Sequence, residues 1–371
     1  MVVGHNNNLF HHVHKEYGQD KPMHLIMKSI LTFRNRRYLY AIITLTLLLL
    51  FVLTYTCIGV KDNAKYEAIT KLVDNILAKG GNVEYRTDQY SNNVTSIYNI
   101  RPTTGKKKPV SSRVLDNISR IECSFYQPSV DDITLLGALE NPDSLTLSYV
   151  CLSDPQFQAI GNYLSALKNL LFIHSTFSPN GGKHLSKLHN LDFLHMYDTK
   201  ISDSDLVGSG GLPIRHLGFS SCDITDRGLK NMLPLDNIEE VSLYDIQISD
   251  NITDFFNSCP KLRKIDIYFE TPSGKLTCKF LRDMTTTSVI QSICLCNVDL
   301  DDELLAEVER FSNLKVFWVI SPLVTKKSLP VLERLSQRMS VNVSNFNEDF
   351  ETVFRFEKGK SFYWEHIGVK P

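Results

Sequence analysis

The sequence has little of what marks several common protein classes. Its 371 residues hold only eight cysteines, too few for a small domain built on disulfides. The 40 Lys and Arg residues are balanced by 41 Asp and Glu residues, so the net charge is −1 and no basic excess exists to neutralise phosphates. At 43% hydrophobic and 22% charged residues, the chain is too apolar to be disordered as a whole. The composition excludes a disulfide scaffold and argues against a nucleic-acid partner.

Catalytic signatures are also lacking. The sequence contains no G-x-x-x-x-G-K-[ST] phosphate loop, no G-x-S-x-G elbow and no H-E-x-x-H zinc motif. Asp301, Asp302 and Glu303 stand where we expect a helix to begin, and carboxylates there complement the helix N-terminus. We interpret them as structural, and we expect no enzyme activity, no cofactor and no metal site.

One long uncharged run is present near the start. Tyr38 to Val60 spans 23 residues without a charged side chain. A helix of that length measures about 34 Å, enough for a hydrocarbon core of about 30 Å. Basic residues crowd its N-terminal flank, and the more basic flank stays cytoplasmic (Lys28, Arg34, Arg36, Arg37). We predict an uncleaved single-pass signal-anchor with an extracytoplasmic repeat domain. A cleaved signal peptide is the main alternative, and its apolar region is usually shorter.

An apolar pattern recurs about every 24 residues from residue 118 onward. The third apolar position of each copy marks the repeat, with spacings of 23 to 28 residues: Cys123, Leu147, Phe172, Met196, Phe219, Leu243, Ile267, Leu295, Val319 and Val343. The alternating stretch around each marker predicts a short strand, and the Ser/Thr-Asp that follows predicts a helix start. One strand and one helix cannot bury their own apolar face, so the turns must stack into an α/β solenoid.

The copies resemble leucine-rich repeats whose loop reads Ile/Val-Thr/Ser-Asp-x-Gly-Leu. Residues 222–229 (CDITDRGL) match that form closely, and the resemblance covers roughly residues 114–345. The side-chain ladder of the family is weak, because Cys222 and Thr199 occupy a position that elsewhere holds Val150, Ser175, Ile246 or Glu270. The whole layout is similar to bacterial single-pass proteins with a basic tail, one anchor and such repeats. The resemblance implies a leucine-rich-repeat solenoid that binds a partner.

These patterns divide the chain into five parts. We expect a basic cytoplasmic tail at 1–37, the transmembrane helix at 38–60, and a helix with a polar loop at 61–113. The repeats follow at 114–345, and a C-terminal cap occupies 346–371. Whether translation starts at Met1 or at Met27 stays open.

Strand alternation predicts which side chains face the concave surface of the solenoid. They are Phe193, His195, Tyr197, His216, Glu240, Tyr244, Lys264, Asp266, Tyr268 and Trp318. Aromatic side chains on an exposed strand face are unusual unless something covers them, and Tyr and Trp often anchor interfaces. We predict that this strip binds a partner. The alternative is that the side chains pack on one another or lie under an inserted segment.

The cysteines leave pairing open. Cys259 and Cys278 lie on the non-strand side of neighbouring turns and can pair in an oxidising compartment. Cys294 and Cys296 flank Leu295, so both face the concave side, but no CxxC unit or nearby His supports a metal or redox pair.

The leading hypothesis is therefore a membrane-anchored protein-interaction module whose partner is another protein or an envelope polymer. One alternative is a structural envelope protein that associates with itself as a homo-oligomer. If the topology is reversed, the alternative is a cytoplasmic adaptor or scaffold.

Overall fold

The computed structural model describes residues 64–87, 96–99, 118–139, 142–179, 181–271, 276–347, 350–356 and 363–367. The chain divides into two compact units, Met1–Lys65 and Tyr66–Pro371, and the repeats lie in the second. The predicted anchor from Tyr38 to Val60 lies outside the described residues. Within the described residues, no helix is both long and apolar enough to cross a membrane.

Ten strands run in sequence order through one sheet, each parallel to the next. They are β3 (Ile118–Ser124), β4 (Ser144–Ser148), β6 (Asn169–Ile173), β8 (Phe193–Tyr197), β9 (His216–Ser220), β10 (Glu240–Tyr244), β11 (Lys264–Tyr268), β12 (Ser292–Cys296), β13 (Val316–Ile320) and β14 (Ser340–Asn347). Each strand contains one of the ten sequence markers, and every marker is buried. The α/β solenoid is confirmed.

The two ends of the sheet depart from the parallel order. β1 (Asn82–Thr87) and β2 (Ser96–Asn99) add antiparallel strands before β3, and β15 (Phe350–Phe356) and β16 (Tyr363–Ile367) add them after β14. Residues 64–78 are helical, and their buried face, which includes Ile69 and Ile76, joins the same core as Val83 and Ile118. At the N-terminal end, the helix and β1 cover the apolar end that a stack of turns leaves open. The C-terminal cap expected at 346–371 stays a prediction.

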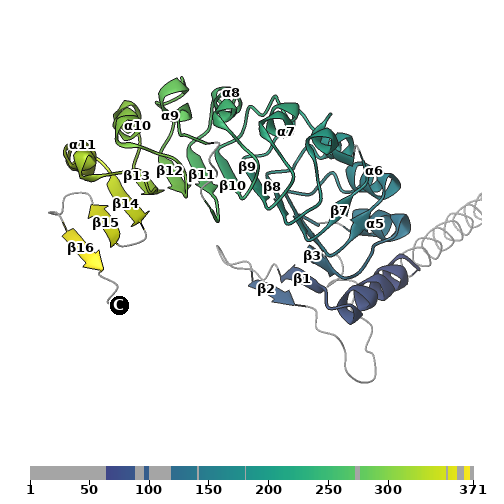
Figure 1. The fold of residues 1–371 in the computed structure, drawn as a ribbon. Coiled ribbons are helices and arrows are strands. Elements are labelled where there is room, and N and C mark those ends of the chain that lie inside the picture. The colour runs from purple at the N-terminus through teal and green to yellow at the C-terminus, as the bar shows by residue number, and fades with distance from the viewer. Residues whose placement is uncertain are drawn as a thin grey trace, which may run out of the picture. The chain divides into compact units, whose positions relative to one another are not determined.

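Helices return the chain from each strand to the next, and within the second unit they form the outer layer over the sheet (Figure 1). The α-helices are α5 (Val130–Gly137), α6 (Asp154–Tyr163), α7 (Asp226–Asn231), α8 (Thr253–Asn257), α9 (Phe280–Asp283), α10 (Asp302–Ala306) and α11 (Leu329–Ser336). The 3-10 helices are η1 (Gly181–Lys187), η2 (Asp203–Leu206), η3 (Asp250–Ile252), η4 (Glu307–Arg310) and η5 (Lys326–Ser328). A small second sheet pairs β5 (Cys151–Leu152) with β7 (Thr176–Phe177).

The helix expected in each turn is of the 3-10 type alone in two places. The turns from β6 to β8 and from β8 to β9 contain only the 3-10 helices η1 and η2. Glycine is the physical reason, because each glycine disfavours a helix by about 1 kcal/mol relative to alanine. Gly181 and Gly182 begin η1, and Gly208, Gly210 and Gly211 follow η2.

Most of these strands end at a residue in the left-handed backbone conformation. Phe125, Tyr149, His174, Asp198, Ser221, Asp245 and Asn297 have φ between 44° and 57°. This conformation costs a non-glycine residue about 1–2 kcal/mol. The backbone N–H of each residue donates to the last carbonyl of the following strand, as from Asp198 to Ser220 and from Asp245 to Tyr268, both at 2.8 Å. The bond to the next turn offsets the cost and closes the strand at the same place every time.

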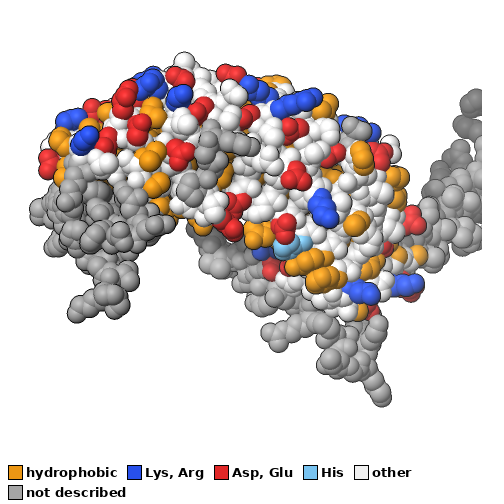
Figure 2. All heavy atoms as spheres, in the orientation of Figure 1, with side chains coloured by type: hydrophobic (Ala, Val, Ile, Leu, Met, Phe, Trp, Pro, Cys, Tyr) orange, Lys and Arg blue, Asp and Glu red, His pale blue; other side chains and the backbone are white. Residues whose placement is uncertain are grey.

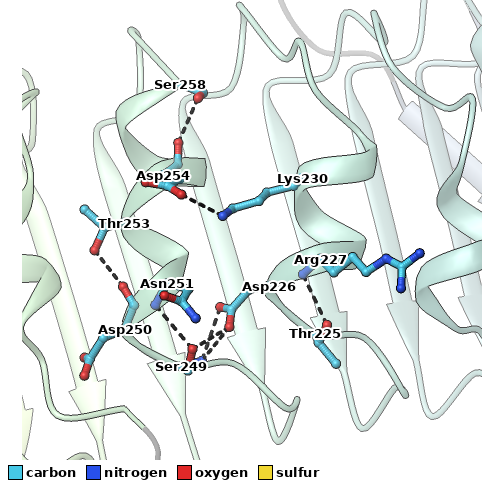
Figure 3. Close-up of polar contacts among 10 residues, drawn as sticks. All are labelled: Thr225, Asp226, Arg227, Lys230, Ser249, Asp250, Asn251, Thr253, Asp254 and Ser258. Carbon is cyan, nitrogen blue, oxygen red and sulfur yellow. Dashed lines mark hydrogen bonds and ion pairs between the residues drawn. The ribbon is translucent and has the colours of Figure 1, made fainter.

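A second link between turns uses the aspartates of the repeat. Four carboxylates accept hydrogen bonds from the backbone and hydroxyl of a Ser or Thr one turn further on: Asp203 from Thr225, Asp226 from Ser249, Asp250 from Thr277 and Asp302 from Thr325. We call this series the aspartate ladder. Figure 3 shows the Asp226 rung, where the Ser249 Oγ lies 2.6 Å from the carboxylate.

Two of these residues, Thr225 and Ser249, also cap their helices, as the sequence predicts. Thr225 accepts from the backbone N–H of Arg227 at 3.2 Å, and Ser249 accepts from that of Asn251 at 3.3 Å (Figure 3). Gly228 of the CDITDRGL segment has a packing role, because a Cβ at this position would collide with the Asp203 carboxylate. The cap was predictable, whereas the link between turns was not.

The aspartate ladder generates a prediction about stability. Asp226→Ala leaves the Ser249 N–H and hydroxyl without their acceptor, so we expect a loss of about 1–3 kcal/mol in the free energy of unfolding. Chemical denaturation of the purified chain, followed by circular dichroism, measures it. Asp223→Ala in the same turn is the matched control, because Asp223 is exposed. Equal denaturation midpoints for the two variants would contradict a stabilising ladder.

Candidate partner-binding face

Strand register arranges the outward side chains of β8 to β13 in three rows, which we call the concave face. The first row contains Phe193, His216, Glu240, Lys264, Ser292 and Val316; the second His195, Gly218, Ser242, Asp266, Cys294 and Trp318; the third Tyr197, Ser220, Tyr244, Tyr268, Cys296 and Ile320. All ten side chains singled out from the sequence lie in these rows. Their role in binding stays a prediction.

Ion pairs link the three charged or titratable side chains of the first row. His216 Nδ1 lies 3.5 Å from Glu240 Oε2, and Lys264 Nζ lies 3.8 Å from the same oxygen. Lys264 Nζ also lies 2.9 Å from Asp266 Oδ2, and this hydrogen bond raises the pKa of Lys264. Exposed pairs of this kind contribute little stability. Their effect is to keep the Lys264 ammonium between Glu240 of the first row and Asp266 of the second row.

His195 is less available than the alternation suggests. Its ring lies over Gly218 on the neighbouring strand, where an added Cβ would come within 2.5 Å of His195 Cδ2. Phe193 packs edge-on against the ring at 5.8 Å between centroids. Burial lowers the pKa of His195 below its ordinary value of 6.5, so the ring is neutral at neutral pH. At this end of the strip the side chains do pack on one another.

Further along, the concave face sinks into a hollow of about 620 Å³. Six of the ten predicted residues line it: Tyr197, Tyr244, Lys264, Asp266, Tyr268 and Trp318. Tyr197, Tyr268 and Trp318 remain 47%, 41% and 46% exposed. The rings of Tyr244 and Tyr268 meet edge to face at 6.0 Å. The other four predicted residues, Phe193, His195, His216 and Glu240, do not line the hollow.

Two acidic residues of the hollow were missed from the sequence. Asp245 is the left-handed residue that ends β10, and its Oδ1 accepts from the backbone N–H of Glu270 at 2.6 Å. Both side chains line the hollow from the turns beyond the strands. Alternation within strands says nothing about turns. The available signal was the aspartate directly after Tyr244, because Asp tolerates the left-handed conformation better than most residues.

A separate aromatic ladder follows the strand ends at the start of the solenoid. Phe125 and Tyr149 stack at 4.3 Å between ring centroids, Tyr149 and His174 stack at 4.7 Å, and His174 meets Tyr197 edge to face at 5.6 Å. Figure 2 shows hydrophobic side chains gathered around a histidine in this part of the molecule, while charges of both signs are interspersed over the helical layer. The rings cover one another's faces, which stabilises them in the absence of any partner.

All the described cysteines except the exposed Cys151 are buried or half-buried. Cys259 and Cys278 are buried and free, and no disulfide joins any of the seven described cysteines. Burial raises the pKa of the Cys259 thiol to about 12. Burial, and then the nearby Asp266 carboxylate, raise the pKa of Cys294 to about 11. A thiol with so high a pKa is a poor nucleophile and a poor metal ligand. The described part of the chain holds no group of three or more His, Cys, Asp or Glu suited to a metal ion.

Comparisons with known proteins give no family. No protein-family model matches the chain, and no curated protein matches it in sequence. Among solved structures, TLR13 in its complex with ssRNA13 is similar at 14% identity and a TM-score of 0.36, over 59% of this chain and 38% of that one. An internalin (inlF) from Listeria monocytogenes is similar at 14% identity and a TM-score of 0.26, over 65% and 91% of the two chains. These scores are too low to carry an argument, so the solenoid rests on its own strand order.

The packing of His195 on Gly218 generates a prediction about its titration. Gly218→Ala pushes the imidazole away from the sheet and into water. Because burial is what lowers the pKa of His195, we expect that pKa to rise toward 6.5 in the variant. A proton NMR titration of the imidazole signals measures it, with His195→Gln used to assign the resonance. An unchanged His195 pKa would show that Gly218 does not determine its burial.

Proposed function

We propose that the chain is a membrane-anchored leucine-rich-repeat protein whose concave face binds a protein partner. The observation that carries the proposal is the hollow between β8 and β13, where Tyr197, Tyr268 and Trp318 remain exposed on a rigid sheet. Aromatic side chains held in register are the groups that most often dominate binding energy at protein interfaces.

The charge of the hollow supports a protein over a nucleic acid. Three carboxylates and one ammonium line it, from Asp245, Asp266, Glu270 and Lys264. A nucleic acid would have to bring phosphates against that negative charge, and phosphate neutralisation supplies most of the affinity for such partners. A second copy of this chain and an envelope polymer are the alternatives, and crosslinking from the hollow separates them from a distinct protein partner.

We propose a binding role without catalysis. The chemistry available in the hollow is one paired lysine, three carboxylates, tyrosines and two half-buried thiols. Burial raises the pKa of Tyr244, as it does that of both thiols, so these groups are kept in their neutral, unreactive forms. The Cys294 thiol is hydrogen-bonded to the Asp266 carboxylate, but its raised pKa keeps it protonated, so we propose no reaction here.

A photo-crosslinking experiment tests the binding face. A benzoylphenylalanine in place of Tyr268 should form an adduct with a partner protein in cells, whereas the same group in place of Arg227 should not, because Arg227 is exposed on α7 in the helical layer. Trp318→Ala should reduce the Tyr268 adduct at least ten-fold, because it removes a neighbouring anchor. An adduct with the mass of two copies of this chain would favour self-association. Adducts formed equally from both positions would contradict a specific concave face.

The anchor is the second part of the proposal. It is supported by the uncharged run from Tyr38 to Val60, and the basic residues before it favour an extracytoplasmic repeat domain.

Cys151 is exposed and free, so the chain supplies its own topology probe. A membrane-impermeant maleimide should label Cys151 in intact cells, and Cys151→Ser should remove that signal. Labelling only after lysis would place the repeats in the cytoplasm and favour an adaptor or scaffold.

A further inference from the structure

One carboxylate oxygen in the lining of the hollow, Asp266 Oδ1, lacks a hydrogen-bond donor among the described residues. Asp266 is only 8% exposed, and its Oδ2 is bound to Lys264 Nζ at 2.9 Å. Its Oδ1 is buried and has no hydrogen-bond partner within the described part of the chain, and the other contact of the carboxylate is with the Cys294 thiol, which is only a weak donor. Leaving a buried acceptor unsatisfied is unfavourable, and more so for a charged group. A ligand that brings a donor to Oδ1 recovers that cost.

The charges around Asp266 favour a positively charged hydrogen-bond donor from a ligand. The hollow carries a net charge of −2, from the carboxylates of Asp245, Asp266 and Glu270 and the ammonium of Lys264. That ammonium is already shared between Asp266 and Glu240, at 2.9 and 3.8 Å. A positively charged ligand is therefore attracted into the hollow, and no ammonium among the described residues of its lining is left unpaired.

The aromatic walls of the hollow indicate which kind of cation fits. Tyr244, Tyr268 and Trp318 line the hollow beside Asp266 and offer aromatic faces and edges. A cation over an aromatic ring is attracted to it, and a planar guanidinium also stacks on the ring while its N–H groups reach a carboxylate. At about 620 Å³, the hollow falls within the usual size range of small-ligand sites.

We propose that the hollow receives an arginine side chain from an extended segment of the partner protein, with its guanidinium donating to Asp266 Oδ1 and stacking against the Tyr and Trp side chains. This inference rests on the proposed function of the concave face and names the chemistry of its partner. A neutral glycan also stacks on aromatic rings and donates O–H groups, but it leaves the net charge of −2 uncompensated.

Fluorescence of Trp318 tests the inference directly. The chain has two tryptophans, so Trp364→Phe in the full-length protein makes Trp318 the single reporter in the hollow. The probe is the peptide acetyl-Gly-Arg-Gly-Arg-Gly-amide. We expect a saturable change in Trp318 emission, at least ten-fold weaker apparent affinity for the matching Gln peptide, and weaker binding at higher salt.

Two variants connect the response to the carboxylates. Asp266→Asn should weaken binding of the Arg peptide at least ten-fold, and Glu270→Gln should weaken it by a few fold. Glu270 is exposed at the rim, so its variant folds even if Asp266→Asn is unstable, and thermal melting checks both. Asp223→Asn, on an exposed carboxylate that does not line the hollow, should bind as the parent does.

Several results would overturn the inference. They are equal binding of the Arg and Gln peptides, a folded Asp266→Asn variant with unchanged affinity, and saturable binding of chitohexaose without binding of the Arg peptide. If the Arg peptide fails while Tyr268 still crosslinks to a partner, only the arginine inference is wrong. If both fail, the proposed function is wrong as well.

Discussion

The hydrogen bond that the residue after each strand of the large sheet from β3 to β13 donates to the next strand is the constraint on which the rest of the structure depends, and seven of these nine residues are left-handed. It starts every turn from the same place, so the strands pair without slipping. Because side chains alternate along a strand, a slip of one residue would exchange the buried and outward sets. The three rows of the concave face and the hollow between them exist because this register is kept from β8 to β13.

Periodicity was enough to predict the strand series, because each apolar marker occupies the one position that every turn must bury. It was not enough for the outer layer. The chain can return to the next strand through an α-helix or a 3-10 helix without changing the core, and local glycines such as Gly181 and Gly182 decide between them. The aspartate ladder was missed for a related reason, since a Ser/Thr-Asp pair has the same sequence signature whether it acts within a turn or between turns.

The concave face, too, was predictable from the sequence only in part. Alternation correctly placed ten side chains on one side of the sheet, and it also predicted that Tyr197, Tyr268 and Trp318 would be exposed there. The depth of the face was not predictable, because it depends on small residues such as Gly218, over which His195 folds, and on acids in the turns. Asp245 and Glu270 belong to no repeating strand position, so only the three-dimensional structure brings them beside Asp266.

The aspartate ladder runs in one direction, and this has a consequence for how the gene can change. The turns that begin at Thr225 and Ser249 each carry both an acceptor Asp for the next turn and a donor hydroxyl for the previous one. Such a turn can be duplicated or deleted without leaving a broken link. The turn at Thr277 has buried Cys278 where Asp226 and Asp250 stand in theirs, so the ladder stops there and resumes only with Asp302. As far as the ladder is concerned, an exchange of turns before Thr277 keeps every link, whereas an exchange across it breaks one.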